Sequence, residues 1–136
     1  MSENTILPDD LIFGSMTVFL SNYWKDDVDS VIIRHRRAND SSKEEHMRLD
    51  NVGMFEAHRF VMNIVYDVSF FFPDFDYWWI MLTTKNLRVY TIKSNFYCNI
   101  SPNDNGDVLL TLSSDTMYLY VELSYSTNCL QSIYEL

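Results

Sequence analysis

The part of the chain after Pro73 consists of short strand-like segments separated by turns, and this pattern restricts the fold more than any other feature. Between two of these segments lies the pair Asn105-Gly106, which favours the positive φ angles of a tight hairpin turn. Runs of β-branched, aromatic and aliphatic residues bounded by polar turns predict strands. The predicted strands are residues 76–83, 87–92, 96–100, 107–112 and 117–125.

The last of these strands shows the clearest alternation. Because successive side chains of a strand point to opposite faces of its sheet, residues of one kind at every second position predict one buried and one outward face. The apolar positions are Met117, Leu119, Val121 and Leu123. The outward positions are Tyr118, Tyr120, Glu122 and Ser124.

The part of the chain before Pro73 gives a mixed pattern. Residues 11–20 and 30–37 predict two strands, and Asn39 to Arg48 reads as a polar loop. Apolar residues then recur at spacings of three and four from Phe55 to Val68, which favours an amphipathic helix at about residues 53–69. Pro73 should end it, since the residue before a proline avoids the helical region.

These elements predict an α+β fold, an antiparallel sheet of about five to six strands with the helix at about 53–69 packed on one face. The 136 residues suit a single domain spanning 1–136, with residues 1–10 as a loose lead-in. The aromatic fraction is 15%, so rings such as Tyr118, Tyr120, Trp78 or Trp79 are left for the other face of the sheet. They form either a second core layer or a binding surface there.

Two features predict a cytoplasmic protein. Cys98 and Cys129 allow at most one disulfide, and the N-terminus lacks the basic start and apolar core of a signal peptide. We therefore expect both cysteines to be reduced thiols. The apolar run at 77–82 is also too short to span a bilayer.

The charge distribution points to a basic partner. The net charge is −9, and no Lys or Arg follows Lys93. Nucleic acid and anionic lipid are polyanions that attract Lys and Arg, so we expect no direct nucleic-acid partner and no membrane partner. The basic group at 34–37 is the exception, and we interpret it as a solvated strand end that pairs with nearby acids.

The sequence contains no recognisable catalytic set. His35, His46 and His58 lack a signature around them, and the glycine content excludes the phosphate-binding loops of nucleotide enzymes. No dense spacing of Cys or His predicts a metal site. We therefore expect no enzyme activity, no metal and no cofactor.

The residue types and charge predict an acidic inhibitor that resembles an immunity protein. It would block a basic protein that handles nucleic acid, such as a nuclease toxin, by steric and electrostatic occlusion. Tyr and Trp are frequent interface anchors, and carboxylates beside them attract basic groups. The predicted partner-binding residues are Tyr23, Trp24, Asp26, Asp27, Asp29, Tyr118, Tyr120 and Glu122.

Two other functions remain open. A small molecule or peptide would bind in a concave cavity ringed by Trp78, Trp79 or Tyr120 on the aromatic face of the sheet. An enzyme with a dispersed site would bring His35, His58 and an acid into one cleft. The identity of the partner and the oligomeric state do not follow from the sequence.

Overall fold

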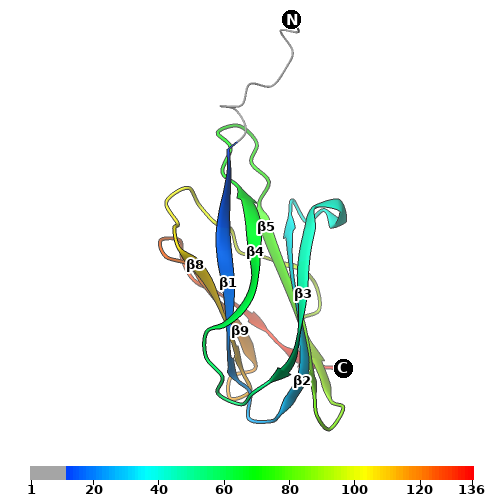
Figure 1. Cartoon of the computed structure of the whole chain (residues 1–136). Helices are drawn as coiled ribbons and strands as arrows, with labels where there is room; N and C mark the ends of the chain where they lie inside the picture. The colour runs from blue at the N-terminus through cyan, green and yellow to red at the C-terminus, as the bar shows by residue number, and fades with distance from the viewer. Residues whose placement is uncertain (1–11) are drawn as a thin grey trace, which may run out of the picture.

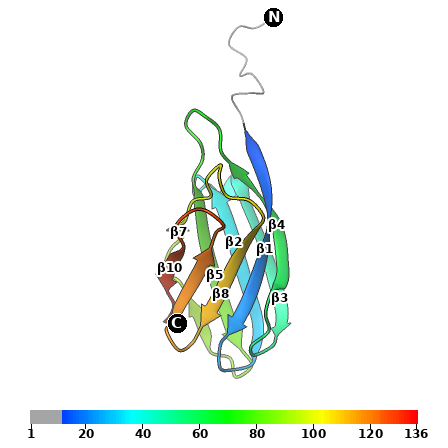
Figure 2. The same cartoon turned by 90° about the vertical axis from the view of Figure 1, so that its left-hand side faces the viewer.

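The computed structural model describes residues 12–136, which form two β-sheets packed face to face (Figures 1 and 2). The lead-in expected at 1–10 lies outside these residues. Sheet A has the order β10 (Cys129–Ser132), β9 (Tyr118–Glu122), β8 (Asp107–Ser113), β1 (Phe13–Tyr23), β4 (Arg59–Asp67). Sheet B has the order β11 (Tyr134–Glu135), β6 (Val89–Thr91), β5 (Asp76–Thr84), β2 (Val28–Arg37), β3 (Glu44–Val52), and β7 (Phe96–Tyr97) also pairs with β5.

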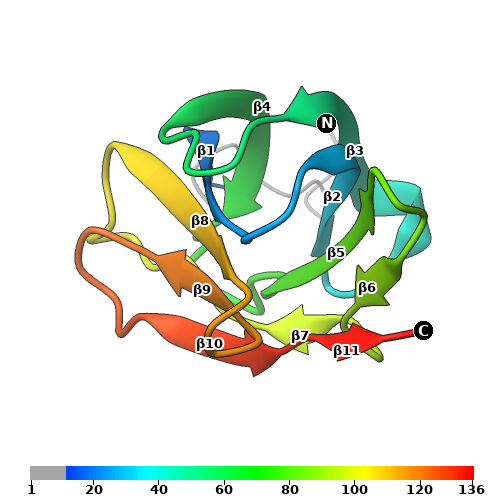
Figure 3. The same cartoon turned by 90° about the horizontal axis from the view of Figure 1, so that it is seen from below.

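Within residues 12–136, neighbouring strands are antiparallel except for one pair, β1 and β8, which is parallel. Viewed from below, β10 and β11 follow one another from sheet A to sheet B (Figure 3). The 3-10 helix η2 (Ser41–Lys43) begins at Asp40, whose side chain accepts a hydrogen bond from the Ser42 backbone N–H. The architecture is a β-sandwich.

The predicted α+β fold is wrong because residues 53–69 contain no helix. Residues 59–67 form β4, an edge strand of sheet A. Opposite β1 the register shifts by one residue, since Val18 pairs with Met62 and Phe19 pairs with Phe60. The inserted residue, Val61, is buried like Met62, and this irregularity gives a strand the apolar spacing of a helix.

Two further sequence predictions are corrected. Residues 44–52, which fall largely in the predicted polar loop, form β3, and its side chains are mostly exposed because β3 is an edge strand of sheet B. The expected hairpin around Asn105-Gly106 does not form, since β7 lies in sheet B and β8 in sheet A. Gly106 does adopt a positive φ of 85°, but the turn belongs to a crossover between the sheets.

The core lies between the two sheets. The alternation of β9 is confirmed, because Leu119, Val121 and Leu123 are buried while Glu122 is exposed. Trp78 of β5 is 1% exposed, and its indole N–H donates to the Cys98 carbonyl oxygen at 2.9 Å. Trp78 is therefore a core residue and not part of an outer aromatic face.

The prediction of two reduced thiols is also wrong, because Cys98 and Cys129 form a disulfide with a Cα–Cα distance of 6.1 Å. The bond joins the crossover that follows β7 to strand β10, across 31 residues of sequence. Cys98 is fully buried. Sequence spacing alone does not show that two distant cysteines meet.

Within residues 12–136, no helix is long and apolar enough to cross a membrane.

Candidate functional site

The outer face of sheet A carries a group of aromatic and aliphatic side chains. The register places Tyr23, Ser113 and Tyr118 in one row across β1, β8 and β9, and Thr111, Tyr120 and Leu130 in the next across β8, β9 and β10. We call this surface the aromatic face and define it by Phe19, Tyr23, Phe55, Phe60, Leu109, Tyr118, Tyr120 and Leu130.

Three pairs of rings in contact lie on the aromatic face. Ring centroids are 6.3 Å apart for Phe19 and Phe60, 6.2 Å for Tyr23 and Phe55, and 6.1 Å for Tyr118 and Tyr120. Phe55, Phe60 and Leu130 are each more than half exposed. A group of exposed aromatic and aliphatic side chains on one side of a protein marks an interaction surface.

The loop at 53–58 supports one border of this face. The Asn22 backbone N–H donates to the Glu56 carbonyl oxygen at 2.7 Å, and the Asn22 side-chain amide donates to the Gly53 carbonyl oxygen at 3.0 Å. The Ser21 hydroxyl accepts the His58 backbone N–H at 3.1 Å. These bonds hold Phe55 against the end of β1, so this border is ordered before any partner binds.

Charge is divided unequally between the two sheets. Strands β8, β9 and β10 contain no Lys or Arg. The carboxylates of Asp107 and Glu122 form no ion pair with any residue from 12 to 136. On the outer face of sheet B, by contrast, the Arg34 guanidinium lies over the Trp79 ring at 4.4 Å.

Arg36 and Arg48 also belong to sheet B, on neighbouring strands. They pair with Glu44 and Asp50, each at 2.8 Å. The side chains of Arg34, Arg36 and Arg48 therefore lie on the outer face of sheet B, on the opposite side of the sandwich from the aromatic face.

Four of the eight predicted partner-binding residues come together on or beside the aromatic face, namely Tyr23, Tyr118, Tyr120 and Glu122. Trp24 instead points into the core, is 3% exposed and packs on the Tyr90 ring at 4.8 Å. The three aspartates lie at the β1–β2 connection and the start of β2. Lys85 contacts Asp29 at 3.4 Å, whereas Asp26 and Asp27 form no ion pair with the part of the chain described.

Sequence reasoning missed five members of the aromatic face, which are Phe19, Phe55, Phe60, Leu109 and Leu130. Phe55 and Phe60 were placed on the apolar side of the predicted helix. The alternation of side chains along β8 was the signal that could have placed Leu109 on the outer face, because Val108 and Leu110 on either side of it are fully buried.

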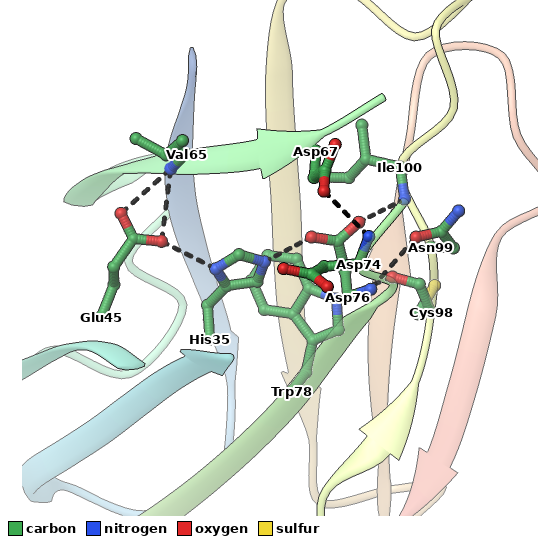
Figure 4. A network of polar contacts seen from close by, with 10 residues as sticks. All are labelled: His35, Glu45, Val65, Asp67, Asp74, Asp76, Trp78, Cys98, Asn99 and Ile100. Carbon is green, nitrogen blue, oxygen red and sulfur yellow. Dashed lines mark hydrogen bonds and ion pairs between the residues drawn. The ribbon is translucent and has the colours of Figure 1, made fainter. Parts of the chain in front are cut away.

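A polar cluster around His35 lies inside the sandwich (Figure 4). His35 has no exposed side-chain surface, and its Nε2–H donates to Asp76 Oδ1 at 2.6 Å while its Nδ1–H donates to Glu45 Oε1 at 2.9 Å. Asp76 Oδ2 accepts the Ile100 N–H at 2.9 Å, and both Glu45 oxygens accept the Val65 N–H. The cluster therefore links β2, β3, β4, β5 and the crossover after β7.

This cluster joins a histidine to two carboxylates but has the features of a structural element. No pocket opens among residues 12–136, and His35 is packed against the Trp78 ring at 4.7 Å. His58, the second histidine of the hypothetical dispersed enzyme site, lies on the other sheet beside Phe19 at 6.4 Å. His35 and His58 therefore do not lie in one cleft, which is the arrangement that would have favoured an enzyme.

The pKa of His35 is raised above its ordinary value. Burial alone would lower this pKa, but the hydrogen bonds and negative charges of Asp76 and Glu45 favour the imidazolium more strongly. The two carboxylates thus favour the positively charged form of His35 over the neutral form.

We expect the free energy of unfolding to fall as the pH rises from about 6.5, the ordinary histidine pKa, through the raised pKa of folded His35. Below that range His35 is protonated in both the folded and the unfolded chain, and its full contribution to stability is present. Above that range the folded chain loses the imidazolium and the stability that comes with it. Urea unfolding at a series of pH values measures this. The H46Q variant, altered at an exposed histidine, should keep the dependence, and an unchanged slope in H35Q would contradict the assignment.

No group of His, Cys, Asp and Glu among residues 12–136 is arranged to hold a metal ion. The chain matches no protein-family model, and no curated protein matches it in sequence. These comparisons and the all-β fold give no support to the expected immunity-protein and toxin relationship, and the function below is proposed without it.

Proposed function

We propose that the protein is a binding module whose aromatic face docks a basic protein segment. The observation that carries this proposal is that Tyr23, Tyr118, Tyr120 and Glu122 share one outer face with exposed rings, where the carboxylates of Asp107 and Glu122 form no ion pair within residues 12–136. Tyrosine and phenylalanine provide large contact area with few rotatable bonds, so they contribute much of the energy of many interfaces.

The unpaired carboxylates supply the preference for a basic partner. Asp107 begins β8, Glu122 ends β9, and the two strands lie side by side. Asp26 and Asp27 add negative charge at the β1–β2 connection. Exposed carboxylates steer positively charged molecules toward the surface and speed their association.

We also propose that the protein works in an oxidising compartment. The expected cytoplasmic location rested on the lack of a signal-peptide pattern and on there being at most one possible disulfide, and that one disulfide does form, between Cys98 and Cys129. Disulfides persist mainly in secreted and other oxidising settings.

The D107N/E122Q variant should bind an oligo-arginine peptide roughly threefold to tenfold more weakly than the wild type at low salt, because two exposed charges are removed. Isothermal titration calorimetry measures the affinity. The control D50N/E135Q makes the same change of net charge on sheet B and should bind nearly as the wild type does. Equal weakening in both variants would show that only the overall charge matters, which contradicts the proposal.

A further inference from the structure

The loop between β4 and β5 presents three consecutive phenylalanines to solvent. Phe70 is 80% exposed, Phe71 63% and Phe72 96%. Phe70 and Phe71 contact each other edge to face with centroids 4.8 Å apart. A fully exposed phenylalanine is costly in water, so three in succession indicate a surface that is covered when the protein functions.

The backbone of this loop is held in place from below. Asp67 is buried, and its carboxylate accepts the backbone N–H groups of Ser69 and Asp74, each at 2.9 Å. Lys43 reaches the Asp74 carboxylate at 2.6 Å from η2. Phe72 itself has a positive φ of 49°, which a phenylalanine rarely adopts without such support. These contacts hold the loop in a fixed conformation that projects from the sandwich.

Other apolar side chains surround the base of the loop. Phe75 packs on Tyr97 with ring centroids 5.7 Å apart, and both are about half exposed. Phe13 is also about half exposed, and the Arg37 guanidinium lies over its ring at 5.2 Å. This end of the sandwich, which we call the phenylalanine tip, consists of Phe13, Phe70, Phe71, Phe72, Phe75 and Tyr97.

We propose that the phenylalanine tip inserts into the interface of a zwitterionic lipid bilayer. Phenylalanine side chains and an amphipathic tyrosine are suited to the boundary between headgroups and acyl chains. The loop would enter one leaflet of the bilayer without crossing it. The proposal differs from the sequence-based expectation of no membrane partner, which considered only anionic lipid.

The size of the loop that carries Phe70, Phe71 and Phe72 argues against a second copy of the chain that docks on this loop alone. A stable protein interface buries about 800 Å² on each partner. Three phenylalanines contribute roughly 150–250 Å² each when fully buried, and these are already partly covered. A bilayer, which is fluid and apolar, needs no complementary surface to receive a projecting loop.

The charge of the chain selects the kind of lipid. The net charge of −9 opposes approach to an anionic surface, whereas it has little effect at a zwitterionic one. The tip also lies at the opposite end of the sandwich from Tyr23, because Phe13 and Tyr23 are the two ends of β1 (Figure 1). A molecule docked by the tip would leave the Tyr23 end of the aromatic face accessible.

Co-sedimentation of the full chain with phosphatidylcholine vesicles tests the proposal. The wild type should bind, F72S should partition about tenfold less strongly, and F70S/F71S/F72S should stay in the supernatant. The control is L87S, since Leu87 is an equally exposed apolar residue, 81% exposed, in the turn between β5 and β6. L87S should bind as the wild type does, and circular dichroism should show that every variant is folded.

Three results would overturn the proposal. The wild type could remain in the supernatant at high lipid concentration, the triple variant could bind as well as the wild type, or binding could require added phosphatidylserine. A wild type that is dimeric in analytical ultracentrifugation, does not bind vesicles and becomes monomeric in F70S/F71S/F72S would assign the tip to self-association instead.

Discussion

Replacing His35 with leucine should lower the free energy of unfolding by about 3–5 kcal/mol, which is the typical cost of removing one partner from a buried ion pair. The variant leaves the carboxylate of Asp76, which has no exposed side-chain surface, without its hydrogen-bond partner on His35. It also leaves Glu45 without its bond to Nδ1. Urea unfolding at neutral pH measures the loss.

The matched control is H46L, which removes another histidine that contacts a carboxylate, Glu44 at 2.8 Å, but on the surface of β3. Exposed pairs contribute little, so H46L should change stability by no more than about 1 kcal/mol. If H35L were as stable as H46L, the His35 cluster would not hold the two sheets together.

Removing the disulfide with C98S/C129S should cost about 3–4 kcal/mol, because the bond closes a long loop and restricts the unfolded chain. The bond also fixes the crossover that supplies the Ile100 N–H to Asp76. Thermal unfolding with and without dithiothreitol measures the effect, and reduction of the wild type should reproduce most of the loss. An unchanged midpoint after confirmed reduction would show that the bond is not structural.

The predictable part of the fold was the part with regular alternation. The inward and outward sides of β9 followed from its sequence, and Tyr118, Tyr120 and Glu122 were correctly placed on one face. Residues 30–37 and 76–83 were also expected as strands and lie within β2 and β5. Residues 30–37 were expected from their β-branched start, and residues 76–83 from a continuous apolar run.

The failures have local causes. In β4, the bulge at Val61 breaks the alternation, so its apolar spacing resembles that of a helix. In β3, an edge position allows a sequence that is mostly polar and reads as a loop. Gly106 marked a real turn, but a turn residue does not show which strands it connects.

Much of the candidate site depends on tertiary pairing and was beyond sequence reasoning. Phe19 and Phe60 meet because β1 and β4 are neighbours, although the residues are far apart in the chain. Trp24 follows Tyr23 directly, yet it points into the core against Tyr90 because the chain turns there toward sheet B. Residue type alone did not distinguish the two rings.

The central claim is that the aromatic face of sheet A is the binding surface. Amide chemical-shift mapping by NMR, with unlabelled oligo-arginine peptide added to the isotope-labelled protein at low salt, tests it most directly. The account predicts that the largest shifts fall on β1, β8 and β9 around Tyr23, Leu109 and Tyr120, and that they decline as salt is raised. Shifts centred on sheet B, or spread evenly over both sheets, would contradict it.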